Sequence, residues 1–493
     1  MKKISACLFL AGLASAVAAQ TNAPARTMSL QDCIAEALKH NFDVRVERYE
    51  PLKAQLSLDA AYAGYDPNFN ISGQHAFDST GSEFANGFAY PPYVSDQNAF
   101  NSGLSGTLPS GLQYNLSGNV AQTYGSSGGS PFDSTSGSFG ITLDQPLLKN
   151  FWIDSTRLAI AAARNQIKYT QQGLRQQLIT TISAVENAYF ELVYARENLT
   201  VEQEALDLAQ TQLDQDRQRV EVGSLAPLDV QQDEAQVAQS HANLIAAQFT
   251  QQTDENALKN LMTDNYLAWE GVALKPTATL EAVRQLFDVQ DSWSKGMAAR
   301  PDLLQAKVTL EQQGIQLKYD FNQLFPQLDV TGSYGFNGNG VQFSDAFGQI
   351  NEGSSPYYTY GGKMTMPLAN LGPRSAYKSD KAVQQQDVLK LKQLEQNVMV
   401  EIDNAVKQAQ SAWESVDATK QARVYAEAAL DAEQKKYSVG KSTTFTVLQL
   451  QNNLTSARSA EIRALANYQE ALTNLAQQEG TTLERRSVDV TAK

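Results

Sequence analysis

The chain has 493 residues, of which 42% are hydrophobic, and a formal net charge of −14. A chain this acidic is a poor ligand for nucleic-acid phosphates, so nucleic acid is excluded as a partner. Beyond residue 19, no uninterrupted apolar stretch approaches about 18 residues, the length expected of a membrane-spanning helix.

The N-terminus has the three parts of a secretory signal. Lys2 and Lys3 precede an apolar run over residues 4–17, and small residues follow at Ala18 and Ala19. Signal peptides have a basic region, a short hydrophobic region and a cleavage site of small residues, in this order. We therefore expect residues 1–19 to be a signal peptide. The exported chain keeps one cysteine, Cys33, and is expected to form no internal disulfide.

The rest of the chain is predicted to be built twice. Matching segments occur in one order in the two halves: residues 41–44 with 300–303, 66–73 with 325–332, 143–147 with 364–368, 222–223 with 439–440, and 257–261 with 471–475. Such internal repetition indicates a duplicated architecture. We predict a first repeat over residues 28–262, a linking equatorial segment over 263–298 that is irregular or carries a strand, a second repeat over 299–480, and a tail over 481–493. Each repeat reads as helix, strands, long helix, turn and helix.

The first repeat is expected to contain four strands, at about residues 67–77, 98–109, 111–123 and 136–147. Apolar and polar residues alternate, as where Tyr114 and Leu116 interleave with Asn115 and Ser117, and a period of two places the two kinds on opposite faces. Each strand has about 10 residues, the length that a tilted transmembrane strand needs. The connections are long over 81–97 and 338–355 and tight at 108–111, so we favour a membrane barrel with a polar lumen over a soluble sheet.

A long helical hairpin follows, over about residues 152–262. Apolar residues recur at intervals of seven, which is the seam of a coiled coil: Leu178, Val185, Leu192, Leu199, Leu206, Leu213 and Val220. Gly223 is expected to end the first helix, and Pro227 suits the first turn of the second. A helix of about 65 residues reaches roughly 100 Å at 1.5 Å per residue, so the tip at 223–229 lies far from the strands.

The second repeat offers strands at about residues 326–337 and 356–367 and a hairpin over about 373–479, with its tip at 440–449. Its seam alternates steps of four and three: Val398, Ile402, Ala405, Ala409, Ala412 and Val416. Gly440 is expected to end the first helix, and Thr443 or Thr444 to cap the next. Six strands cannot enclose a wide lumen, because even eight leave an interior filled by side chains, and open edges cannot face lipid. Protomers are therefore expected to share one barrel.

Residues that could carry chemistry are scattered. The three histidines, His40, His75 and His241, fall in different elements, and Cys33 is about 10 Å along a helix from His40, too far to share a zinc ion. No sequence motif of a hydrolase or nucleotide-binding loop occurs. We interpret the pair Asp233-Glu234 as surface charge on a solvated helix face. We therefore expect no enzyme activity, no cofactor and no metal.

The tip sequences resemble those of one family. Residues 222–230 and 437–448 look like the paired hairpin tips of the outer-membrane efflux proteins, the TolC-like export ducts. The opening over residues 29–38 with 41–44 resembles that family's start, and residues 468–475 resemble its end. The resemblance spans about residues 28–480, and its specificity lies in the order and duplication of these motifs.

This resemblance implies a mainly α fold with a transmembrane β-barrel contribution: a trimeric barrel in the outer membrane and a coiled-coil tunnel across the periplasm. It implies a homotrimer in outer-membrane lipid that serves as the passive export duct of a tripartite efflux or type I secretion system. Its partners would be a periplasmic adaptor (a membrane fusion protein) and an inner-membrane pump of the RND or ABC type. The positions matching the family's gate and adaptor contact are Gly223, Leu225, Asp229, Gly440, Ser442, Thr446 and Gln449.

Two departures from the family pattern are evident. The second tip has Ser442, Thr446 and Gln449 where members often carry an arginine and acidic residues, so Asp229 is the only matching carboxylate. The strand pair around residues 108–111 is extra. The usual trimeric barrel of the family has twelve strands. Six strands per protomer would give eighteen if this pair joins the barrel wall, whereas a pair that folds aside would leave the barrel at twelve.

The competing function is a periplasmic helical adaptor or scaffold without a membrane barrel. That reading predicts a protein extractable without detergent, and the six alternating strands argue against it. An envelope enzyme is a third class, with no feature of the sequence in its favour.

Overall fold

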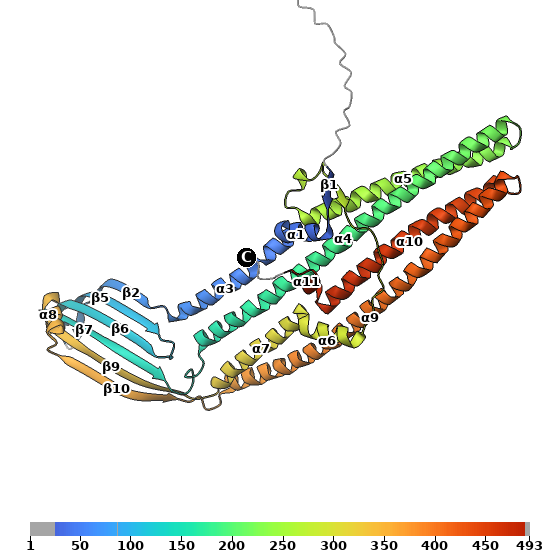
Figure 1. Ribbon diagram of the computed structural model, residues 1–493. Helices are drawn as coiled ribbons and strands as arrows, with labels where there is room; N and C mark the ends of the chain where they lie inside the picture. Colours follow the sequence, from blue (N-terminus) through green and yellow to red (C-terminus); the bar gives the residue numbers. More distant parts are fainter. Residues whose placement is uncertain (1–24, 86, 489–493) are drawn as a thin grey trace, which may run out of the picture.

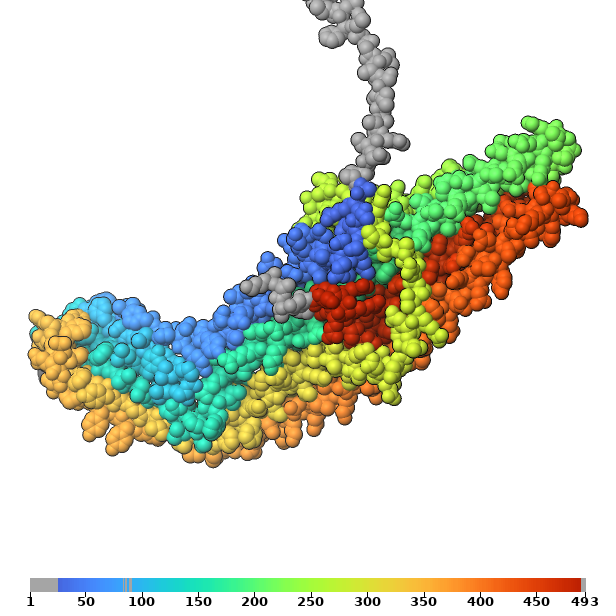
Figure 2. All heavy atoms as spheres, viewed as in Figure 1, coloured from blue at the N-terminus to red at the C-terminus, as the bar shows by residue number. Residues whose placement is uncertain are grey.

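The computed structural model describes residues 25–85 and 87–488. The expected signal peptide, residues 1–19, lies outside the described residues. The molecule is elongated, with a β-sheet at one end and paired long helices that run from it to two tips at the other end (Figure 1). The space-filling view shows the same rod-like outline, with the two hairpins in contact along much of their length (Figure 2).

The main sheet has six antiparallel strands in the order β10-β9-β7-β6-β5-β2. Their bounds are β2 Asn68–Thr80, β5 Tyr93–Thr107, β6 Gln113–Ser127, β7 Ser130–Pro146, β9 Gln327–Gly340 and β10 Pro356–Thr365. The extra pair, β5 and β6, is hydrogen-bonded between β2 and β7, so it joins the wall of the sheet and does not fold aside. Separately, β1 (Ala25–Met28) pairs in parallel with β8 (Ala273–Pro276).

The register gives the sheet one apolar and one polar face. Leu116 lies opposite Leu104 and Ile141, and Ile141 in turn lies opposite Tyr334. Residues directly opposite one another share a face, so an apolar row crosses four strands. The alternate positions carry polar residues, such as Asn115. Among the described helices, none is both long and apolar enough to cross a membrane.

Two segments expected to be long connections contain regular structure, which corrects that prediction. The first holds a small hairpin of β3 (Glu83–Ala85) and β4 (Phe88–Tyr90), and the second holds α8 (Phe343–Glu352). The helix forms because Phe343, Ala346, Phe347 and Ile350 recur at helical spacing. The linking segment also ends in a helix, α6 (Val289–Ala299), besides η2 (Tyr266–Ala268) and β8.

Each half contributes one long hairpin. The first comprises α4 (Ser155–Glu221) and α5 (Pro227–Met262), and the second comprises α9 (Leu371–Ser438) and α10 (Thr444–Glu479). The shorter helices are α1 Leu30–His40, α2 Phe42–Glu47, α3 Tyr49–Tyr62, η1 Ala63–Tyr65, α7 Pro301–Asn322 and α11 Thr482–Arg485. The predicted seam of α4 faces inward: five of its seven positions are buried, namely Leu178, Val185, Leu192, Leu206 and Leu213.

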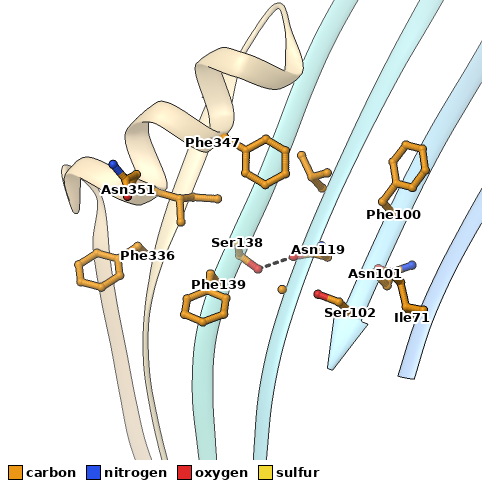
Figure 3. Close-up of a pocket in the computed structure, with 13 residues that line it drawn as sticks. Ile71, Phe100, Asn101, Ser102, Asn119, Ser138, Phe139, Phe336, Phe347 and Asn351 are labelled. Atoms are coloured by element: carbon orange, nitrogen blue, oxygen red, sulfur yellow. Dashed lines mark hydrogen bonds between the residues drawn. The ribbon is translucent and has the colours of Figure 1, made fainter. Parts of the chain in front are cut away.

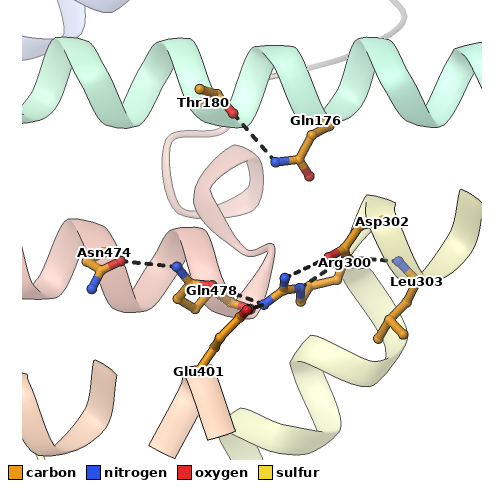
Figure 4. Close-up of polar contacts among 8 residues, drawn as sticks. All are labelled: Gln176, Thr180, Arg300, Asp302, Leu303, Glu401, Asn474 and Gln478. Atoms are coloured by element: carbon orange, nitrogen blue, oxygen red, sulfur yellow. Dashed lines mark hydrogen bonds and ion pairs between the residues drawn. The ribbon is translucent and has the colours of Figure 1, made fainter. Parts of the chain in front are cut away.

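Equivalent junctions confirm the duplication. Asn41 caps α2 and its side-chain amide donates to the carbonyl of Leu261 at the end of α5, 3.1 Å away. In the second half, Arg300 occupies the N-cap of α7 and donates to the side-chain oxygen of Gln478 near the end of α10, 3.0 Å away. Arg300 also pairs with Asp302 and Glu401, each at 2.7 Å (Figure 4). Each hairpin is thereby tied to the helix that leads into its half.

Candidate functional site at the helical tips

The turns at the two tips have the same backbone geometry. Gly223 and Gly440 both adopt φ of +75°, a left-handed conformation that favours glycine. The amide of Gly223 donates to the carbonyl of Val220, and the amide of Gly440 donates to that of Tyr437, at 2.9 and 3.0 Å. In both tips the next amide donates to a carbonyl five residues earlier. The sequence therefore ends both helices by the same device.

The two tips differ in how the returning helix begins. Pro227 lies in the first turn of α5, where Ala226 gives no side-chain cap. Thr443 caps α10, accepting from the amide of Thr446, which settles the predicted choice between Thr443 and Thr444.

The seven residues predicted from the family resemblance all lie in or next to these turns. Ser442 donates to Glu433 at 2.6 Å, and Leu225, Asp229, Ser442 and Thr446 are half-buried. Gly223, Gly440 and Gln449 are exposed. Their role in closing a channel stays a prediction.

A buried polar cluster just behind the turns joins the two hairpins. Asp216 of α4 is fully buried and accepts from the hydroxyl of Tyr437 at the end of α9, 2.7 Å away. Gln212 donates to the same carboxylate at 2.8 Å, and Tyr437 also shares a hydrogen bond of 2.9 Å with Thr444. Arg219 lies 3.5 Å from Asp216 and covers the ring of Tyr437, 4.5 Å from its centroid. We call Gln212, Asp216, Arg219, Tyr437 and Thr444 the tip latch.

Burial sets the protonation of the tip latch. It raises the pKa of the Tyr437 phenol to about 12, so the hydroxyl keeps its proton at neutral pH and acts as a donor. A hydrogen bond from a neutral donor to a carboxylate is stronger than one between neutral groups. The contact between Tyr437 and Asp216 is therefore an effective tie between the hairpins.

A second carboxyl faces this cluster without a partner of its own. Asp233 of α5 is fully buried, and neither of its oxygens has a hydrogen-bond partner among the described residues. Burial first, and then the neighbouring carboxyls Asp216 and Asp229, together raise its pKa to about 7. A fraction of Asp233 is thus protonated at neutral pH.

The prediction that Asp233-Glu234 is surface charge was wrong for Asp233. Glu234 is exposed and pairs with Arg217 at 2.8 Å, as a solvated charge does. Asp233, however, precedes the buried Ser240 by seven residues and shares its side of α5.

Asp216 was missed altogether, although a signal existed. It follows the buried Leu213 by three residues, as Ala209 follows Leu206. A carboxylate at a seam position of a coiled coil marks a buried polar contact.

Further polar contacts hold the hairpins together below the tip latch. Gln236 of α5 exchanges hydrogen bonds of 2.8 and 3.1 Å with Asn452 of α10. Arg458 pairs with Glu204 at 2.8 Å and Arg463 with Glu191 at 2.6 Å. These contacts bind α10 to the first hairpin.

The described residues hold no group of three or more potential metal ligands. Cys33 is buried, and burial raises the pKa of its thiol to about 12, which makes it a poor nucleophile. The tips thus offer hydrogen bonding and charge.

Comparison with known proteins gives a consistent picture. The family model described as outer membrane efflux protein matches residues 33–263 and 294–481. The outer membrane efflux protein BepC of Brucella suis is 25% identical over 332 residues, which are 67% of this chain and 69% of that protein. The outer membrane protein TolC of Vibrio cholerae is 26% identical over 375 residues, which are 73% of this chain and 81% of that protein.

Solved structures share the fold at low identity. The CmeC outer membrane channel of Campylobacter jejuni superposes with a TM-score of 0.66 at 16% identity, covering 92% of this chain and 86% of that one. The open state of the MtrE outer membrane channel of Neisseria gonorrhoeae gives a TM-score of 0.65 at 17% identity, covering 94% of this chain and 91% of that one.

Proposed function

We propose, on the premise that this chain belongs to the outer membrane efflux protein family and is therefore an outer-membrane export channel, that its periplasmic end is gated by the tips of its helical hairpins. Channels of this family are ducts and not enzymes, and the helices of this one extend into the periplasm. The adaptor or scaffold alternative lacks support, since it would place no part of the chain in the outer membrane.

The observation that carries the gate proposal is the hydrogen bond from Tyr437 to Asp216. It joins Tyr437 of α9, three residues before Gly440, to Asp216 of α4, seven residues before Gly223. Opening a tunnel at its narrow end requires one hairpin to move relative to the other, and such motion breaks this buried bond. The tip latch therefore favours the closed arrangement without contributing to the barrel.

We propose a homotrimer as the working form. The edge strands β2 and β10 each have one strand neighbour among the described residues, and unpaired edges cannot face lipid. Three six-stranded sheets would close into a barrel of eighteen strands. Energy for export would come from an inner-membrane pump of the RND or ABC type through a periplasmic adaptor that contacts the tips, in a tripartite efflux or type I secretion system.

The seven residues matched to the family's tips are proposed to surround the constriction and contact the adaptor. Their exposed or half-buried side chains lie at the extreme end of the hairpins. Smaller side chains among these seven residues, for instance in the double variant Asp229→Ala with Thr446→Gly, are expected to raise the leak of solutes through the channel. An unchanged leak would count against a constriction at these residues.

The gate is tested by single-channel conductance of the detergent-purified trimer in a planar bilayer. Tyr437→Phe removes the hydroxyl that donates to Asp216 and keeps the ring under Arg219. A hydrogen bond to a charged group contributes about 1.5–3 kcal/mol, and about 1.4 kcal/mol shifts an equilibrium tenfold. We expect the open probability to rise about tenfold or more.

Tyr425→Phe is the matched control, because Tyr425 lies on the same helix and is 72% exposed. It should behave as the wild type. An unchanged open probability in Tyr437→Phe, or an equal rise in both variants, would remove the basis for a gate at the tip latch.

A further inference from the structure

The helix α8 lies at the end of the sheet remote from the long helices (Figure 1). It packs on the apolar face, to which Phe100 and Leu104 of β5 belong. A directly opposed glycine pair, Gly137 and Gly338, makes room for it. A Cβ on Gly338 would collide with the carbonyl oxygen of Ala346, and one on Gly137 would reach Ile350 at 3.4 Å. The ring of Phe343 packs edge-on against Phe100, with centroids 5.9 Å apart.

Polar contacts fix α8 in this position. Thr135 of β7 donates to the carbonyl of Val341 at 3.0 Å, and Gln349 exchanges hydrogen bonds of 2.7 and 3.1 Å with the backbone of Asn339. Asp345 accepts from the amides of Val341 and Gln342 at the start of the helix. The helix is thus held on the strands from both of its ends.

A groove of about 560 Å³ lies between α8 and the strands. Its apolar wall consists of aromatic and branched side chains from α8 and five strands (Figure 3): Ile71, Phe100, Val120, Phe139, Phe336, Phe347 and Ile350. None of the described residues that line it carries a charge. Phe347 is 57% exposed and stands at the rim of this groove.

The position of the groove identifies what covers it. In a membrane barrel the apolar face of the strands meets lipid and the polar face meets the lumen. Gly137 lies nine residues along β7 from Pro146, where the strand meets the periplasmic part. At about 3.3 Å per residue and a tilt of roughly 40°, this places α8 about 23 Å above the periplasmic edge of an apolar band roughly 25 Å tall. The groove therefore opens at the outer rim of the bilayer.

We propose that this groove is a binding site for an acyl chain of an outer-leaflet lipid, with α8 lying in the membrane interface. The helix has the amphipathic form expected there: its apolar side faces the strands and the groove, and Ser344, Asp345 and Glu352 are exposed. An uncharged, aromatic-lined groove that is continuous with the lipid-facing surface suits a hydrocarbon chain and offers nothing to recognise a charged headgroup. One chain would be held per protomer.

The test uses the full trimer in phosphatidylcholine vesicles that contain a trace of phosphatidylcholine with a nitroxide on its acyl chain. Electron paramagnetic resonance then gives the fraction of motionally restricted lipid. Gly118→Leu fills the floor of the groove, because a Cβ at Gly118 lies 3.2 Å from the ring of Phe139. Phe347→Ser removes the rim from an exposed position, so it does not depend on repacking of the sheet.

Gly362→Leu is the control. Gly362 lies opposite Val330 on the same apolar face but outside the groove. A Cβ added at Gly362 would have the carbonyl oxygen of Asp329 as its nearest atom, 3.8 Å away. We expect both groove variants to lose the restricted signal of one chain per protomer and the control to retain it. An equal signal in all four proteins, or an equal loss in the control, would overturn the proposal. Conductance of the same vesicles reports on the gate separately, since these substitutions lie far from the tips.

Discussion

The two helical hairpins have nearly identical dimensions and different polar side chains at their tips. The outgoing helices, α4 and α9, have 67 and 68 residues, and the returning helices, α5 and α10, have 36 each. Both turns depend on a glycine at φ +75°. Yet the first hairpin supplies the carboxyls Asp216 and Asp233, whereas the second supplies the hydroxyls of Tyr437 and Thr444.

This difference shows which properties a duplicated coiled coil must keep. Each residue of an α-helix adds about 1.5 Å to its length, so helices of nearly equal length bring the two tips to the same level. Side chains behind the turn are free to diverge. Donors on one hairpin and acceptors on the other make a contact that two identical hairpins cannot make.

The largest effect is expected from Asp216→Ala, which removes the acceptor from the first hairpin. Gln212 would then be left as a buried donor, which costs about 1–3 kcal/mol, and Tyr437 would keep only its hydrogen bond with Thr444. Because the damage is local, the tips should open while the barrel stays folded. Hydrogen exchange of the tip amides should accelerate by at least about tenfold. Asp214→Ala is the control, since the Asp214 side chain is 73% exposed; comparable acceleration there would show that the loss is not specific to the tip latch.

The next effect concerns pH. The pKa of Asp233 is raised from 3.8 to about 7, so its protonated form is favoured by folding. Its contribution to stability is fully present below about pH 4 and is lost as the pH rises through about 7. Asp233→Asn cannot titrate and should flatten the fall of Tm between these values. Glu234→Gln should leave the slope unchanged, and a wild-type slope in Asp233→Asn would contradict the assignment.

A smaller and equal effect is expected at the two turns. Gly223→Ala and Gly440→Ala each place a Cβ in the left-handed region, which costs roughly 1–2 kcal/mol, and neither site has a neighbour within 4 Å that would add a clash. Thermal unfolding of the helical part should therefore shift by the same amount in both variants. A clearly unequal shift would show that the turns are less equivalent than their geometry indicates.

The smallest effect distinguishes the two helix starts. Thr443→Ala removes the cap of α10 and should cost about 1 kcal/mol. Ala226 precedes α5 without a side-chain cap, so Ala226→Ser should stabilise the first tip by a similar amount. Opposite signs in the local opening free energy, measured by hydrogen exchange, are the expected result; a loss of stability in both would argue against capping as the cause.

The sequence was sufficient to predict the hairpins because their signals are strong and repeated. A seven-residue seam, a glycine at each turn and matched segments in both halves all indicate the same architecture. The strands followed from alternation, although β7 begins at Ser130, earlier than predicted. Helix α8 was missed because its four apolar residues lie in a segment rich in Gly and Asn, which indicates a loop when read by composition.

The tip latch was not predicted for a different reason. The motif shared with the family covers the turn itself, where Asp229 is the only matching carboxylate. Asp233 and Glu234 are adjacent acidic residues, and such a pair is typical of a solvated helix face. In a helix, residues three, four or seven apart share a face and adjacent residues do not. Which of two neighbouring carboxyls is buried thus depends on the seam, and the contact between Asp216 and Tyr437 spans 221 residues, beyond the reach of any local pattern.

A double-mutant cycle tests most directly whether one contact between the hairpins holds the periplasmic end closed. Open probability would be measured for Asp216→Ala, Tyr437→Phe and the double variant in planar bilayers. If the two side chains act through one bond, the double variant should open no more than the stronger single variant. Effects that simply add in free energy would mean that Asp216 and Tyr437 act independently, and the tip latch would then not be the gate.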